Sequence, residues 1–133
     1  VLTNKHAIYL RYSIFAYTNL TYAVFAYTNG LLINLKGKYK MKKNTVVIFE
    51  DQKIKIPFDI IVDPKKANEL EEVTNWASGQ KCKIPKFAVA VYDVIKGSEL
   101  FYNNGQFQMA TIINQGRYWF QKYFIKEYYT LLD

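Results

Sequence analysis

Apolar and polar residues follow one another along much of this chain in patterns typical of β-strands. Residues 45–49 and 53–56 are short, mainly apolar segments, and the second reads Lys-Ile-Lys-Ile. A period of two is typical of a half-exposed strand. The acidic and polar residues 50–52 separate the two segments. The pattern therefore predicts two strands joined by a turn.

A different pattern starts at the apolar segment 58–62, which predicts a further strand. Asp63 is a favoured helix N-cap, Pro64 suits the first helical position, and Gly79 suits a C-terminal stop. The apolar residues between them recur at three- to four-residue spacing, as on one helix face, and are Ala67, Leu70, Val73, Trp76 and Ala77. We therefore expect a helix over residues 63–78.

The next part of the chain favours hairpins. Residues 86–95 (KFAVAVYDVI) are almost continuously apolar, and turn signals follow at 96–97 and 103–105. Strands are expected at 86–95, 98–102 and 106–113.

The C-terminal segment 117–132 gives conflicting signals. Its Tyr, Trp, Phe and Ile residues favour strand. Its apolar stripe has helical spacing and consists of Phe120, Phe124, Tyr128 and Leu131. Of the two alternatives, we favour a helix.

Residues 12–35 contain no charged residue and are long enough for a transmembrane helix. Polar and turn-forming residues interrupt the segment, at a high cost in hydrocarbon. The pentapeptide FAYTN occurs at 15–19 and again at 25–29, a spacing of about ten residues that is typical of a strand plus a turn. Buried strands are therefore preferred to a membrane segment, and a membrane partner is not expected.

Together these elements predict a single domain over residues 1–133. Its expected fold class is mainly β (α+β), an antiparallel β-barrel or sandwich with one flanking helix at 63–78 and a possible C-terminal helix. Half of the residues are hydrophobic and 17% are aromatic, including 12 Tyr and 9 Phe. This composition favours β structure and extended contact surfaces.

The chain is basic, with 18 Lys and Arg against 11 acidic residues and a net charge of +7. Such a charge permits a polyanionic partner. The residues singled out for this contact are Lys36, Lys38, Tyr39, Lys40, Lys42 and Lys43. On a strand, the alternating lysines would line one face. The alternative is a solvated row that protects a sheet edge from unwanted pairing.

No residue pattern predicts catalysis, a cofactor or a metal site. His6 is the only histidine, and no Cys/His cluster has zinc spacing. The lone Cys82 excludes an internal disulfide. The lysines beside Cys82 in the sequence would lower its pKa, although an incidental loop cysteine is the simpler interpretation. We therefore expect that the protein is not an enzyme.

The strand at 58–62, the predicted helix closing at Trp76 and the segment KFAVAVYDVIKGSELFY follow one another in this chain. This order resembles the tail-tube proteins of contractile phages and related injection systems, over residues from about 40 to 113. The resemblance implies a small β-barrel or sandwich with one flanking helix. It also implies subunits that stack into hexameric rings and form a tube, without catalysis.

The expected function is therefore that of a non-enzymatic structural subunit. It would assemble with copies of itself and other subunits into a ring, tube or filament, in a virion or another extracellular assembly. An alternative is an RNA- or DNA-associated protein, such as a subunit of a cytoplasmic or organellar ribonucleoprotein or ribosome. A third is a secreted or membrane-anchored filament subunit that uses residues 12–35 as its anchor.

Overall fold

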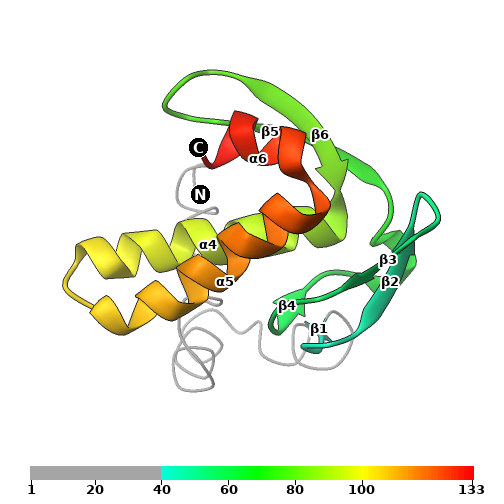
Figure 1. Ribbon diagram of the computed structural model, residues 1–133, viewed down its shortest axis with the longest axis horizontal. Helices are drawn as coiled ribbons and strands as arrows, with labels where there is room; N and C mark the ends of the chain where they lie inside the picture. The colour runs from blue at the N-terminus through cyan, green and yellow to red at the C-terminus, as the bar shows by residue number, and fades with distance from the viewer. Residues whose placement is uncertain (1–39) are drawn as a thin grey trace, which may run out of the picture.

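A computed structural model describes residues 40–133, which form an α+β arrangement (Figure 1). Helix α4 (Lys86–Asn103) lies beside helix α5 (Ala110–Tyr123), and the short helix α6 (Ile125–Leu131) follows α5. The strands are β1 (Lys40–Met41), β2 (Val46–Phe49), β3 (Gln52–Lys55), β4 (Ile60–Ile61), β5 (Leu70–Thr74) and β6 (Lys81–Pro85). They form three separate antiparallel sheets of two strands each, β1–β4, β2–β3 and β5–β6.

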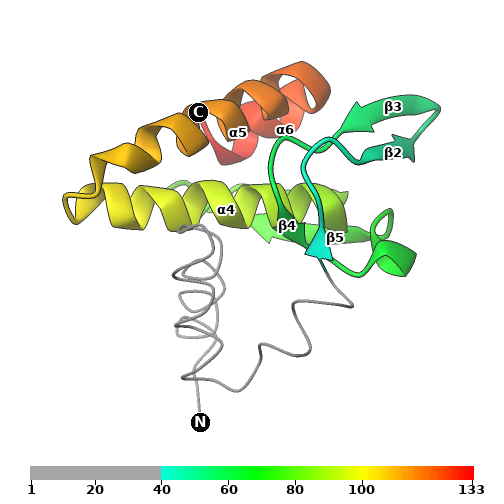
Figure 2. The same cartoon turned by 90° about the horizontal axis from the view of Figure 1, so that it is seen from below.

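The mixed α+β character was expected, but the described residues are not mainly β and do not form a closed barrel. More of them lie in helices than in strands. Strands β4, β5 and β6 contact α4, and the β2–β3 hairpin packs on it through Phe49 and Phe87. In Figures 1 and 2, α4 and α5 run side by side, with the β2–β3 hairpin near one end of the pair.

The predicted hairpin at 45–56 is confirmed. Strands β2 and β3 pair from Val46↔Lys55 to Phe49↔Gln52, which leaves Glu50 and Asp51 as a two-residue turn. Both turn residues have positive φ, 50° and 63°, as a tight turn between twisted strands requires.

The helix predicted at 63–78 is wrong. Asp63 does cap a helical turn, accepting a hydrogen bond from the Lys65 amide, but the turn is only the 3₁₀ helix η1 (Pro64–Lys66). The chain then becomes β5, paired with β6. Gly79 has the expected positive φ, 76°, but it closes the β5–β6 turn instead of ending a helix. The capping signals at Asp63 and Pro64 thus specify only one helical turn, and pairing with β6 makes residues 70–74 a strand.

The strand expected at 58–62 is present only as the short β4, which pairs with β1. The predicted strand–helix order that suggested the tail-tube resemblance is therefore not formed over 58–78. The resemblance itself stays a prediction.

The strand predicted at 86–95 is also wrong, because this segment is the first half of α4. Residues from Phe87 to Ile95 are all buried, so the helix has no polar stripe over these turns that could mark its period. A short apolar run of this kind does not distinguish a buried strand from a buried helix.

The strands predicted at 98–102 and 106–113 are wrong as well. The first is the end of α4, and the second is the 3₁₀ helix η2 (Phe107–Met109) with the start of α5. The turn at 103–105 is present, with φ of 99° at Gly105, but it joins helices. The preferred helix at 117–132 is confirmed by α5 and α6, which meet at Phe124.

The core of the described region combines aliphatic residues of α4 and the strands with a cluster of aromatic rings between the helices and the β2–β3 hairpin. The Phe87 ring lies 5.8 Å from Phe49, 6.2 Å from Trp119 and 6.1 Å from Phe124, measured between ring centroids. Phe87 and Phe120 are fully buried. Burial of such large rings is the main source of stability for the packing of hairpin on helices.

Several predictions concern residues that lie outside the described range 40–133. They include the FAYTN copies, the choice between buried strands and a membrane segment at 12–35, and His6, Lys36, Lys38 and Tyr39. None of the helices among residues 40–133 combines the length and apolar character needed to cross a membrane.

Candidate functional site

The part of the predicted lysine row that the structure describes lies at the base of the β2–β3 hairpin. Lys40 is in β1, and its Nζ lies 3.2 Å from Oδ2 of Asp59. The other oxygen of that carboxylate accepts a 2.8 Å hydrogen bond from the backbone amide of Lys43. Asp59 therefore neutralises Lys40 and holds the turn that carries Lys42 and Lys43, both of which are exposed.

The charge on Asp59 is stabilised by these contacts. Partial burial alone would raise the pKa of its carboxyl group. The hydrogen bond from Lys43 and the ion pair with Lys40 outweigh that effect, so the pKa lies below its usual value. Asp59 is thus ionised at neutral pH and keeps the turn in place.

Sequence reasoning left Lys53 and Lys55 out of the site, although they come close to it in the fold. Strand pairing puts Lys55 opposite Val46 and Lys53 opposite Ile48, so these four side chains share the outer face of the hairpin. The amide of Ile56 donates to the Thr45 carbonyl at 2.9 Å, which joins this face to the turn at 42–44. We call Lys42, Lys43, Lys53 and Lys55 the lysine cluster. In the sequence, the Lys-Ile-Lys-Ile alternation at 53–56 was the sign that Lys53 and Lys55 share one face of a strand.

A second feature is a surface depression of about 310 Å³ between the tip of the β2–β3 hairpin, the β5–β6 ribbon and the corner between α5 and α6. We call it the corner groove. Its apolar lining residues are Phe49, Leu70, Pro85, Tyr123, Phe124 and Ile125. Its charged lining residues are Glu50, Lys83, Lys126 and Glu127, and Gln52 completes the lining. Leu70 is 56% exposed and Ile125 44% exposed, so part of the apolar lining faces solvent.

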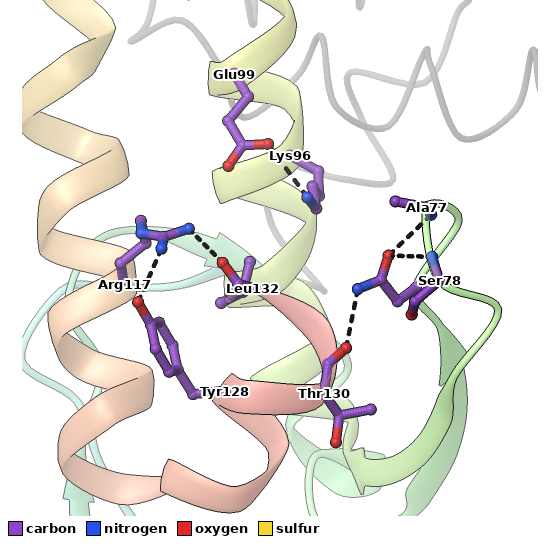
Figure 3. Close-up of polar contacts among 9 residues, drawn as sticks. Ala77, Ser78, Lys96, Glu99, Arg117, Tyr128, Thr130 and Leu132 are labelled. Atoms are coloured by element: carbon purple, nitrogen blue, oxygen red, sulfur yellow. Dashed lines mark hydrogen bonds and ion pairs between the residues drawn. The ribbon is translucent and has the colours of Figure 1, made fainter.

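The walls of the groove are fixed by polar contacts between elements that are distant in sequence. Trp119 on α5 donates from Nε1 to the Lys55 carbonyl at 2.8 Å, which holds the hairpin on the helix. Asn75 donates from Nδ2 to the Thr130 carbonyl at 2.9 Å and so ties the β5–β6 turn to α6 (Figure 3).

Arg117 fixes the position of α6 on α5. Its guanidinium donates to the Leu132 carbonyl and to the Tyr128 hydroxyl, with donor–acceptor distances of 2.6 and 2.8 Å, as Figure 3 shows. The guanidinium also lies 5.3 Å from the centroid of the Tyr128 ring, a cation–π contact. Because the guanidinium of Arg117 and the side chain of Tyr128 contact each other within the fold, we interpret Arg117 as a structural residue and not as part of a binding surface.

Cys82 on β6 is not an activated thiol. Its burial raises the pKa of the thiol, and the negative charge of Glu127 raises it further. The lysines adjacent in sequence do not reverse these effects. A protonated thiol is a weak nucleophile, so the geometry gives no support to cysteine chemistry.

A smaller depression of about 250 Å³ lies where β4, η1 and β5 meet the first turns of α4. Its charged lining residues are Asp63, Lys66, Glu71 and Lys86. Across residues 40–133, no group of three or more His, Cys, Asp and Glu side chains is placed to hold a metal ion.

No protein-family model matches this chain, and neither does any curated protein or solved structure. The corner groove and the lysine cluster are therefore interpreted from their own chemistry.

Proposed function

We propose that this protein is a non-enzymatic structural subunit that associates with copies of itself through the corner groove. The observation that carries the proposal is a partly exposed apolar lining that lies together with charges of both signs. Exposed apolar side chains such as Leu70 and Ile125 beside polar ones are typical of protein–protein contact surfaces.

The charges of the groove favour a second copy over other partners. Two of the charged lining residues are lysines and two are glutamates. In a two-fold contact the same patch meets itself in the opposite direction, so Lys83 and Lys126 of one copy can face Glu50 and Glu127 of the other. A nucleic acid would instead meet two carboxylates at this position.

The higher form of the assembly follows from the sequence resemblance and is part of the proposal. A closed two-fold contact gives a dimer, whereas a ring, tube or filament needs a second, head-to-tail contact. Electron micrographs of concentrated protein test for rings and tubes directly.

Analytical ultracentrifugation over a range of concentrations tests self-association. We expect the full chain to show a concentration-dependent increase in mass, and the double variant Leu70→Glu/Ile125→Glu to remain monomeric. Two added carboxylates repel each other across a two-fold contact and remain hydrated in the monomer. Tyr118→Glu is the matched control, because Tyr118 is similarly exposed, at 67%, and does not line the groove.

A chain that stays monomeric at all concentrations, with no rings or filaments in micrographs, would contradict the proposal. The same holds if Tyr118→Glu removes association as completely as the groove variant does. Far-UV circular dichroism on all variants checks that they are folded.

A further inference from the structure

The lysine cluster differs from the corner groove in the sign and balance of its charges. Lys42, Lys43, Lys53 and Lys55 are all exposed, and none of them forms an ion pair with another residue in the described part of the chain. Lys40 close by is already neutralised by Asp59. Within residues 40–133 these four ammonium groups therefore have no ion-pair partner. Lys42, Lys43 and Lys55 lie at the base of the ribbon, and Lys53 lies farther along its outer face, one strand pair from the turn.

From this geometry we infer that the lysine cluster binds the phosphate backbone of a nucleic acid. Lysine contacts phosphate as a point charge and needs no particular base, so the expected binding is independent of sequence. This site lies outside the corner groove and does not depend on self-association.

The form of the ribbon supports a nucleic acid as the partner. A two-stranded β-ribbon is narrow enough to enter the major groove of a duplex. The outer face of β2–β3 presents Val46 and Ile48 beside Lys55 and Lys53, and both apolar side chains are more than half exposed. In a duplex groove, lysines at this position reach phosphates while the short apolar side chains contact sugar edges or thymine methyl groups.

The opposite end of the ribbon argues against an anionic membrane as the partner. The turn residues Glu50 and Asp51 carry negative charge, and both are exposed. A flat lipid surface large enough to contact the whole outer face would bring these carboxylates close to anionic head groups. A phosphate backbone can cross the base of the ribbon, at Lys42, Lys43 and Lys55, and leave the turn in solvent.

The turn at 42–44 is prepared for this contact before any ligand arrives. Asp59 accepts the Lys43 amide at 2.8 Å, and the Asn44 amide donates to the Ile56 carbonyl at 2.9 Å. Asn44 has a φ of 72°, so the backbone reverses sharply here. A fixed turn loses less conformational entropy on binding than a mobile lysine tail.

Salt-dependent binding of a fluorescein-labelled DNA duplex of mixed sequence tests the inference. For duplex DNA, the logarithm of the binding constant falls with the logarithm of salt concentration by about 0.9 per neutralised phosphate. Changing all four lysines of the cluster to Gln should lower the magnitude of this slope by about three to four, and Lys53→Gln/Lys55→Gln by about two. The matched control Lys65→Gln/Lys66→Gln removes two exposed lysines of η1, outside both the cluster and the corner groove, and should leave the slope unchanged.

Vesicles of phosphatidylserine and phosphatidylcholine are offered to the same variants. The inference is supported if the full chain binds the duplex, the four Lys→Gln substitutions remove this binding, and the full chain binds vesicles only weakly. No duplex binding by the full chain, or a slope that the four substitutions do not change, overturns it. Vesicle binding that depends on the cluster in the absence of duplex binding also overturns it and identifies a lipid site. Because the variants change only exposed side chains, circular dichroism should show the same fold.

Discussion

The β2–β3 and β5–β6 ribbons each consist of two antiparallel strands joined by a short turn, and both pack against the helices. They differ in the contacts that fix them there. The β2–β3 ribbon is held by the buried Ile54, by the Phe49 ring and by hydrogen bonds from Trp119 and Asn68. The β5–β6 ribbon also buries a residue, Ile84, but it continues directly into α4 and is tied to α6 through Asn75.

Packing and hydrogen bonds therefore fix both ribbons, and chain continuity with a helix distinguishes β5–β6. The outer face of β2–β3 is exposed and carries part of the lysine cluster. The β5–β6 ribbon contributes a wall of the corner groove instead. Variants of each ribbon can test this comparison.

The largest effect is expected from Ile54→Ala. Ile54 is fully buried on the inner face of β3, so truncation leaves a cavity and should lower the free energy of unfolding by about 2–5 kcal/mol. Ile48→Ala, on the exposed outer face of the same ribbon, should change it by no more than about 0.5 kcal/mol. Urea unfolding measures both values. Equal losses for the two variants would show that packing on the inner face does not hold this ribbon.

An intermediate effect is expected from Asn75→Ala. This change removes the hydrogen bond to Thr130 and the one that Oδ1 accepts from the Ala77 amide, both at 2.9 Å. The expected loss is about 1–2 kcal/mol, with faster amide hydrogen exchange in β5 and β6.

Asn68→Ala provides the control for that variant. Its side chain makes one exposed bond, to the Ile48 carbonyl, and its removal should cost about 0.5 kcal/mol. If the Asn68 variant were as destabilised as the Asn75 variant, the hydrogen bond from Asn75 to α6 would contribute no more to stability than an exposed one.

The smallest effects are expected at the two turns, and they should have opposite signs. Asp51 has a φ of 63°, which a residue with a side chain adopts at a cost, so Asp51→Gly should raise the free energy of unfolding by about 0.5–1 kcal/mol. Gly79 has a φ of 76°, so Gly79→Ala should lower it by about 1 kcal/mol. Thermal unfolding of the two variants shows whether each change raises or lowers the stability. A fall in stability for Asp51→Gly would mean that the aspartate makes a compensating contact.

Elements that depend on residues close together in the sequence were predicted correctly, whereas elements that depend on contacts between distant segments were not. The β2–β3 hairpin was predicted because the alternation at 53–56 and its turn are local signals. The β5–β6 ribbon was missed because Ala67, Leu70 and Val73 have a spacing that fits a helix, and only pairing with β6 decides otherwise. Helix α4 was missed because a helix buried on every side loses its polar stripe.

The two candidate sites divide in the same way. Lys42 and Lys43 were predicted because they are adjacent in a conspicuous row, whereas Lys53 and Lys55 join them only through strand pairing. The corner groove was not predicted at all, since its lining comes from segments around residues 50, 70, 84 and 125 that meet only in the folded chain.

The positions of the two tryptophans give each ribbon its own optical reporter. The chain contains only two, Trp76 and Trp119. Trp119 is 4% exposed and bonded to β3, whereas Trp76 is 66% exposed in the β5–β6 turn. Detachment of β2–β3 will therefore expose a buried indole and shift its fluorescence to longer wavelength. Detachment of β5–β6 will leave that emission nearly unchanged, and a partner that covers the β5–β6 turn will shield Trp76 from dissolved quenchers. The native chain thus distinguishes the two ribbons without an added label.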